Sequence, residues 1–247
     1  MSRADNAKQK AISALNGSLD KAVQVSRPML LKHIEQTRRS RPNATPEEII
    51  DALGRRFTAT VAGTGAATGA TAAAPGLSTG LSLALAAGDA VGFTGIAALY
   101  VFSLAEVHGI PVQDLERRRT LLLGVMLGDA GASTVQQMAT RTGPHWGRIV
   151  VSKVPVTTLR QINRVLGKNF VTKYGTKQGI LVLGKQVPFG IGAAIGGAGN
   201  ALFAQLTIRS ALRAFGPAPE TWSAHLSDGP TEDTPPEGGE LPPAPIG

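Results

Sequence analysis

The chain of 247 residues is long enough for one large domain or two small ones. Hydrophobic residues make up 43% of it and aromatic residues only 4%, so we expect a core of small side chains with close backbone contacts. The absence of cysteine excludes disulfides, thiolate metal sites and cysteine nucleophiles, and the net charge of +8 conceals a strong asymmetry along the chain.

Residues 3–40 carry apolar side chains at helical spacing and are predicted to form a helix that Gly17 and Pro28 weaken or kink. The next helix has a clear start signal. Thr45 is expected to cap it, and Glu48 stands three positions later, where it completes a capping box.

A segment almost without charge follows. Residues 57–88 contain no charged side chain, Asp89 interrupts, and residues 90–105 are again uncharged. Pro75 and Gly76 divide the segment into two predicted helices, and the second is expected to end at His108-Gly109. Whether this segment spans a membrane or belongs to a soluble core is left open, as it is for residues 187–208.

The rest of the chain is mainly helical in its pattern. Residues 112–127, 157–170 and 188–215 are predicted helices. Residues 134–153 are ambiguous, and the pattern of residues 149–156 is compatible with a short strand. Strand signals are otherwise sparse. The predicted fold is therefore all-α: a multi-helix bundle with glycine-rich, closely packed central helices and a disordered C-terminal tail. The expected divisions are an amphipathic helix (1–44), a helical domain (45–216) and the tail (217–247).

The acidic and basic residues are separated along the chain. The tail, residues 217–247, contains six acids, no Lys or Arg, and eight of the 16 prolines, which is typical of disorder. Between Asp129 and Glu220 there is no acid, but there are eleven basic residues. A segment of one sign indicates an anionic partner, namely a membrane surface, a nucleic acid or the acidic tail; a plain solvated surface is the alternative. If the tail competes for this surface, deleting it should strengthen binding to anionic vesicles.

Within that basic segment, Arg160, Arg164 and Lys168 stand at steps of four residues and form a stripe on the predicted helix. Most such stripes simply face solvent, but a helix of this kind can also lie on an anionic membrane. The residues predicted to contact an anionic surface are Arg160, Arg164, Lys168, Lys173 and Lys177.

Five glycines fall within ten residues before an ordinary amphipathic pattern begins. A phosphate-binding loop would need Lys and Ser or Thr directly after the last glycine, and neither that pattern nor the dinucleotide-binding GxGxxG spacing is present. Small residues at four-residue steps instead predict a helix that packs closely against a neighbour. Each glycine costs a helix about 1 kcal/mol relative to alanine, so close packing is expected to offset the cost. The predicted helix-packing residues are Gly190, Gly192, Gly196, Gly197, Gly199 and Asn200.

Catalytic patterns are weak. The four histidines are scattered, and HExxH, GxSxG and paired carboxylates are absent, so no catalytic residue, metal or cofactor is predicted. Asp89 is interpreted either as a buried polar group or, preferably, as a residue at a helix end or in a loop beside Gly88. Glu106 and His108 are expected to be exposed at a helix terminus. An enzyme with a site near Asp89, Glu106 and His108 is a weaker alternative.

The stretch VPFGIGAAIGGAGNALFAQLTIRSALRAF resembles the signature of the EcsC protein family, in which a proline precedes a glycine-rich segment and a helix follows. A second stretch, YVFSLAEVHGIPVQDLERRRTLLLGVML, looks like the family's upstream block, so the resemblance covers about residues 75–216. It implies a bacterial protein, often regarded as membrane-associated, from a family with no established reaction, catalytic residue or cofactor. The matching positions are Pro188, Gly190, Gly192, Gly196, Gly197, Asn200, Ala211 and Phe215.

These observations predict an architecture and an environment rather than a reaction. We expect a non-enzymatic cytoplasmic protein at the inner face of the membrane, held by apolar glycine-rich helices and a basic surface and accessory to transport or another membrane-linked process. The expected partner is an anionic membrane surface or a membrane protein, and homo-oligomerisation is left open. A nucleic-acid-binding protein that uses the basic segment 130–219 is the alternative, disfavoured by the few aromatic residues and the lack of a docking motif.

Overall fold

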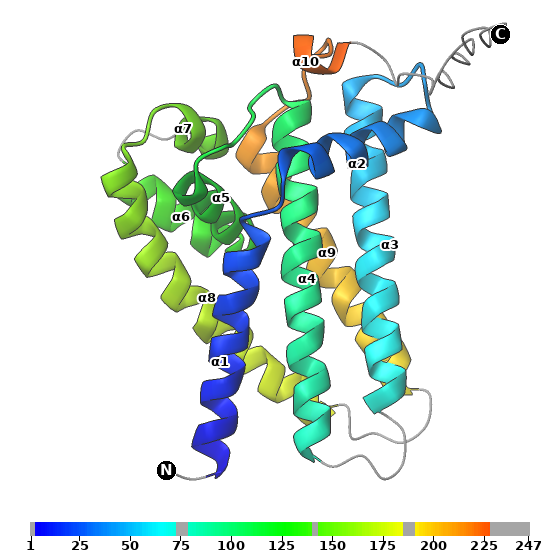
Figure 1. The fold of residues 1–247 in the computed structure, drawn as a ribbon, viewed down its shortest axis with the longest axis vertical. Coiled ribbons are helices and arrows are strands. Elements are labelled where there is room, and N and C mark those ends of the chain that lie inside the picture. Colours follow the sequence, from blue (N-terminus) through cyan, green and yellow to red (C-terminus); the bar gives the residue numbers. More distant parts are fainter. Residues whose placement is uncertain (1–2, 73–78, 140–142, 185–190, 228–247) are drawn as a thin grey trace, which may run out of the picture.

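The computed structural model describes residues 3–72, 79–139, 143–184 and 191–227. Within these residues the chain forms ten helices and no strand (Figure 1). The all-α prediction is therefore confirmed. The strand interpretation of residues 149–156 is wrong, because α7 (Trp146–Ser152) is helical there and turns Trp146 and Val150 into the core.

Five long helices make up most of the fold: three run roughly along the long axis of the molecule, and α8 and α9 are inclined to it (Figure 1). Helix α9 lies along α3, which gives the most extensive helix pair in the fold, while α4 contacts both α3 and α1. Helix α8 packs mainly against α5. The five long helices are α1 (Arg3–Ala22), α3 (Pro46–Ala72), α4 (Thr79–Val107), α8 (Val156–Gly184) and α9 (Ile191–Phe215).

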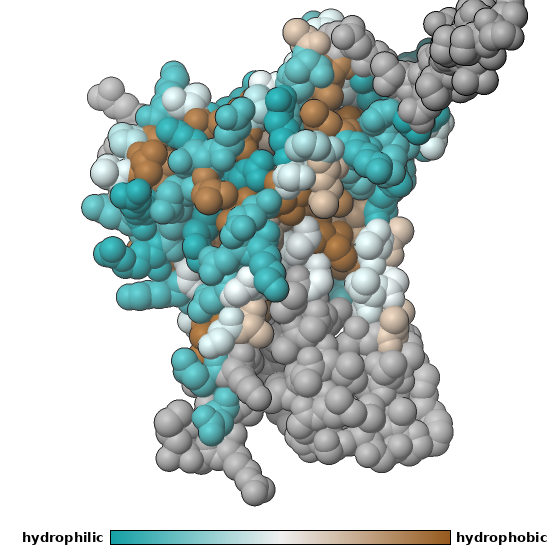
Figure 2. Space-filling model, in the orientation of Figure 1, coloured by the Kyte–Doolittle hydropathy of each residue, from teal (hydrophilic) through white to brown (hydrophobic). Residues whose placement is uncertain are grey.

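Shorter helices gather around the end of the molecule where α4 and α9 finish, at the top of Figure 1. In the space-filling view, hydrophilic residues cover much of this region and hydrophobic residues show between them (Figure 2). The shorter helices are α2 (Arg27–Arg39), α5 (Leu115–Leu127), α6 (Asp129–Met138), α7 and α10 (Ala224–Ser227).

Helix starts follow the local sequence signals. The backbone N–H of Glu48 donates to Thr45 Oγ1 at 3.3 Å, and the N–H of Thr45 donates to Glu48 Oε2 at 2.8 Å, which confirms the capping box. Asp114 caps α5 in the same way, since its side chain accepts from the N–H of Arg117 at 2.9 Å. Pro28 starts α2 rather than kinking a continuous helix, so the predicted helix 3–40 is two helices.

Helix α4 ends where the sequence predicts. Gly109 takes a left-handed backbone conformation with φ of 70°. Its N–H donates to the carbonyl of Glu106, and the N–H of Ile110 donates to the carbonyl of Ala105, both at 2.9 Å. This pair of bonds is a Schellman cap. It fixes the last turn of α4, and with it the positions of Glu106 and His108.

The predicted core face of α8 is confirmed, and the start of the tail is corrected. Residues 217–227 do not belong to a detached tail, because they contact the bundle, and Leu226 is buried. A deletion that tests the tail should thus begin after Ser227, while residues 228–247 lie outside the described residues. The buried hydrophobic residues in the described part of α8 are Leu159, Ile162, Leu166 and Phe170.

Candidate functional site

The uncharged parts of the four longest helices meet at one end of the bundle. Helices α3 and α8 finish at the lower end of Figure 1, and α4 and α9 begin there. We call this the uncharged end and define it by four segments without Asp, Glu, Lys or Arg: residues 57–72, 79–88, 178–184 and 191–208. Uncharged stretches that are far apart in the sequence are thus brought together by the fold.

Basic residues lie beside the uncharged end on two helices that contact each other, α1 and α8. Helix α1 begins at this end and carries Arg3, Lys8 and Lys10 in its first half, together with Asp5. Helix α8 carries Lys168, Lys173 and Lys177 as it approaches the same end. The opposite end, where α3 begins and α4 finishes, holds acids including Glu47, Glu48 and Glu106. We call it the polar end.

The five residues predicted to contact an anionic surface lie on one helix, α8, and three of them form the basic stripe. Arg160, Arg164 and Lys168 are exposed, opposite the buried face of the same helix. The Nε atom of Arg160 lies 3.6 Å from Glu116 Oε1, so the start of the stripe is partly neutralised. The side chains of Lys173 and Lys177 fall outside the described residues. Binding of the stripe to an anionic surface stays a prediction.

The glycine-rich segment is helical from Ile191, the first residue of α9, and Gly190 falls outside the described residues. A Cβ atom placed on Gly199 would meet nothing within 4 Å, so this glycine is not required by close packing. Asn200 does reach α3, where its Nδ2 donates to the carbonyl of Val61 at 3.3 Å. The surroundings of the other three predicted packing residues, Gly192, Gly196 and Gly197, lie outside the description.

Glycines that the structure does require for close packing lie elsewhere. A Cβ on Gly124 would sit 2.5 Å from Cη2 of Trp146, and one on Gly147 would sit 3.0 Å from the carbonyl oxygen of Ala214. Sequence reasoning missed both, because the neighbour that needs the space is a ring or a backbone far away in the chain.

Asp89 lies inside α4, so the preferred interpretation as a helix-end or loop residue is wrong. Its side chain is outside the described residues. Glu106 follows seventeen positions later on the same helix, which corresponds to about 25 Å at 1.5 Å per residue. The three residues of the enzyme alternative therefore do not surround one pocket.

Glu106 is buried at the polar end, contrary to the expectation that it is exposed; its side chain is only 1% exposed. Arg27, in the first turn of α2, holds both carboxylate oxygens, with Nε 2.9 Å from Oε1 and Nη2 3.2 Å from Oε2. His225 of α10 places Nε2 3.0 Å from Oε2. The carboxylate of Glu106 thus links α2, α4 and α10. This contact could not be predicted from the sequence, because Arg27 and His225 are both far from Glu106 in the chain.

His108 is also buried, so its predicted exposure is wrong. Nη2 of Arg148 lies 3.2 Å from Nδ1 of His108, which must accept because arginine only donates; the ring proton is therefore on Nε2. The ring stacks on Phe215 with centroids 5.4 Å apart. Burial, and then the positive charge of Arg148, lower the pKa of His108 to about 4. A neutral, packed histidine is the result.

Two buried arginines complete the polar end. Nη1 of Arg38 donates to the carbonyl of Leu226 at 2.6 Å, and its guanidinium lies over the ring of Trp222 at 4.2 Å. Arg118 donates from Nε to the carbonyl of Val112 at 2.6 Å and from Nη1 to that of Val23 at 3.1 Å. These contacts hold chain segments in place, so the cluster is structural.

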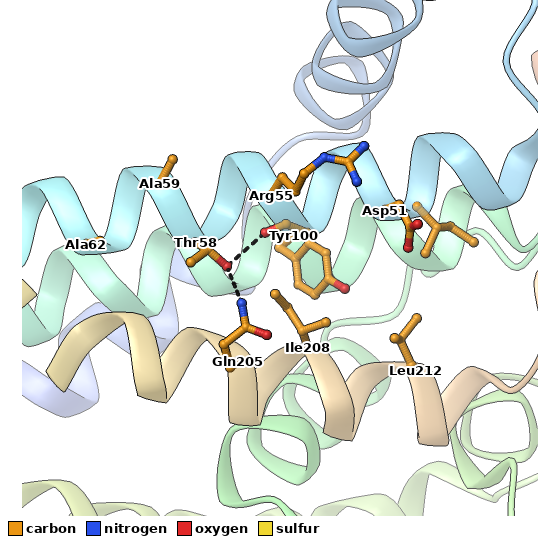
Figure 3. Close-up of a pocket in the computed structure, with 11 residues that line it drawn as sticks. Asp51, Arg55, Thr58, Ala59, Ala62, Tyr100, Gln205, Ile208 and Leu212 are labelled. Atoms are coloured by element: carbon orange, nitrogen blue, oxygen red, sulfur yellow. Dashed lines mark hydrogen bonds between the residues drawn. The ribbon is translucent and has the colours of Figure 1, made fainter. Parts of the chain in front are cut away.

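A groove runs between α3 and α9, with α4 as its floor, and has a volume of about 420 Å³ (Figure 3). Gln205 and Thr58 face each other across it, with Gln205 Nε2 donating to Thr58 Oγ1 at 3.2 Å. Tyr100 rises from α4 and is 2% exposed. The remaining lining residues are Ile50, Asp51, Gly54, Arg55, Ala59, Ala62, Ile208 and Leu212.

Within the part of the chain that the structure describes, no group of three or more His, Asp or Glu side chains could hold a metal ion. No helix, over the same residues, is both long enough and apolar enough to cross a membrane. Comparisons with known proteins find no match among family models, curated proteins or solved structures.

Proposed function

We propose that the protein binds the surface of anionic membranes. Its uncharged end lies in the interfacial layer, and the basic residues of α1 and α8 lie against lipid phosphates. The observation that supports this most is the meeting of uncharged segments from four helices at one end of the bundle, beside basic residues and away from the acids at the polar end. Backbone groups inside these helices are already hydrogen-bonded, whereas the helix termini that lie at this end carry N–H and C=O groups that need water or lipid head groups. This favours contact with the interfacial layer over burial in the hydrocarbon core.

The composition of the uncharged end limits how it can bind. Thr, Gly and Ala gain little from lipid, which favours shallow contact over spanning. Each Lys or Arg near an anionic surface contributes about 1 kcal/mol, and salt screens this contribution. Binding is therefore expected to be reversible and sensitive to salt.

The setting of this activity is part of the proposal. The resemblance to the EcsC family supports a place at the inner face of a bacterial membrane and a role accessory to transport or another membrane-linked process. A membrane protein embedded in the same anionic surface is a compatible partner. We propose no catalytic step.

Flotation with lipid vesicles tests the proposal. The protein should float with phosphatidylglycerol-phosphatidylcholine vesicles at low salt and be released at high salt, and it should not float with phosphatidylcholine alone. Equal flotation with both vesicles, or none with either, would contradict the proposal. Tight binding to DNA together with failure to float would favour the nucleic-acid alternative.

A matched pair of substitutions localises the contact. Ala67 is exposed near the end of α3 at the uncharged end, and Ala130 is exposed in the first turn of α6. We expect Ala67→Glu to weaken vesicle binding about tenfold, since an added acid loses both the lipid attraction and the apolar contact. Ala130→Glu should bind like the unmodified protein. Equal effects of the two changes would rule out the uncharged end as the contact.

A further inference from the structure

The groove between α3 and α9 contains a polar atom that the fold leaves without a partner. The hydroxyl of Tyr100 is buried at the floor of the groove and makes no hydrogen bond in the structure. Leaving such a group unpaired costs about 1–3 kcal/mol. The packing of the ring gives the hydroxyl no freedom to find a partner, because the ring stacks on Phe57 with centroids 4.9 Å apart and planes inclined by 9°.

The hydroxyl points toward the end of the groove where Asp51 and Leu212 lie (Figure 3). Burial, and then the negative charge of Asp51, raise the pKa of Tyr100 above its ordinary value. The phenol therefore keeps its proton and offers a donor, while Asp51 offers a carboxylate acceptor at the same end of the groove.

The remaining walls are mixed. Gly54, Ala59 and Ala62 leave room along α3 and Ile208 faces them from α9, while Arg55, Thr58 and Gln205 are polar. Thr58 and Gln205 already hydrogen-bond to each other. A Cβ on Gly54 would lie 3.6 Å from Ile208, so even this closest approach leaves a methyl-sized space. The volume of about 420 Å³ lies in the range of small-molecule sites. The groove is thus largely apolar around Gly54, Ala59, Ala62 and Ile208, with an unpaired donor, Tyr100, and an acceptor, Asp51, at one end.

We infer that the groove binds a small apolar molecule bearing one hydroxyl group, which accepts a hydrogen bond from Tyr100 and donates one to Asp51. A hydroxyl group does both at once, whereas an ether could not donate. Part of the groove lining, Thr58, Ala59, Ala62, Gln205 and Ile208, belongs to segments of the uncharged end. The inference is nevertheless tested apart from membrane binding, because its probes are small molecules in solution without vesicles.

The test uses the full chain in solution without vesicles, with 1-octanol as the probe and methyl octyl ether as the matched probe that cannot donate. Dissociation constants come from amide chemical shifts. The unmodified protein should bind 1-octanol at least fivefold more tightly than the ether. Equal affinity for the two probes would overturn the inference.

Two variants test whether Tyr100 and Asp51 contact the hydroxyl group of the probe. Tyr100→Phe, which removes only the hydroxyl, and Asp51→Ala should each weaken 1-octanol binding about fivefold or more and leave the ether within twofold. Glu47→Ala, one turn earlier on α3 and outside the groove lining, is the control and should change neither probe. If Tyr100→Phe stabilises the fold but leaves 1-octanol binding unchanged, the unpaired hydroxyl only destabilises the folded protein and does not bind the ligand. The inference then fails.

Discussion

The two ends of the bundle are built by opposite means, although α3, α4 and α9 pass through both. At the polar end, Glu106 and the arginines around it fix segments that are distant in the chain through buried charge pairs and hydrogen bonds. The four segments of the uncharged end are rich in glycine and alanine and contain no charged residue. The difference teaches that the polar end is held by ion pairs and hydrogen bonds of charged side chains, whereas the described contacts of the uncharged end involve only neutral groups, such as Asn200 with Val61 and Gln205 with Thr58.

The largest loss of stability is expected at the polar end, when Arg27 is replaced. Arg27→Ala leaves the buried Glu106 carboxylate without the guanidinium that holds both of its oxygens, and removing one partner of a buried pair typically costs 3–5 kcal/mol. We expect about 3 kcal/mol, since Arg27 itself is partly exposed. The free energy of unfolding in urea measures it. The control is Arg39→Ala, which breaks an exposed pair with Glu35 and should cost less than about 0.5 kcal/mol. Equal losses would show that the polar end is not held by this pair.

Acid should weaken the polar end through His108. Its pKa is about 4 in the folded protein and about 6.5 when unfolded, so between these values the unfolded chain binds the extra proton. The stability from this group is complete above about pH 6.5 and is lost as the pH falls toward 4, with a total of about 3 kcal/mol. His108→Gln cannot be protonated and should flatten the dependence of unfolding free energy on pH over that interval. An unchanged slope would mean that the ring is protonated while folded.

Two glycines in different regions of the molecule are expected to have opposite effects on stability when they are replaced by alanine. Gly124→Ala drives a methyl group into the Trp146 ring and should destabilise the protein by about 1–3 kcal/mol. Gly199→Ala meets open space on α9 and should instead stabilise it, by up to about 1 kcal/mol. Thermal unfolding of both variants distinguishes these signs. A destabilising Gly199→Ala would restore the close-packing role that its sequence spacing suggested.

Local features were predictable and long-range ones were not. The capping box at Thr45, the end of α4 at Gly109 and the buried face of α8 depend on residues a few positions apart, so sequence sufficed. The burial of Glu106 depends on Arg27 and His225, which only the tertiary fold brings near. The need for Gly124 likewise comes from a ring 22 positions away, on α7.

The candidate site was likewise predictable from the sequence only in part. The charge pattern predicted the basic stripe and the uncharged segments, because both can be recognised directly along the sequence. That the four uncharged segments converge at one end follows from the directions of the helices, and the groove follows from the placement of Tyr100 beneath α3 and α9. Neither could be read from spacing along the chain.

Quenching by brominated lipids tests the membrane proposal most directly. Both native tryptophans, Trp146 of α7 and Trp222 near α10, lie toward the polar end, so their fluorescence should be unchanged when the protein binds anionic vesicles containing brominated acyl chains. The additional fluorescence introduced by Ala67→Trp, at the uncharged end, should be strongly quenched in the same vesicles. Quenching of the native tryptophans, or bound protein in which the introduced tryptophan stays bright, would contradict the account.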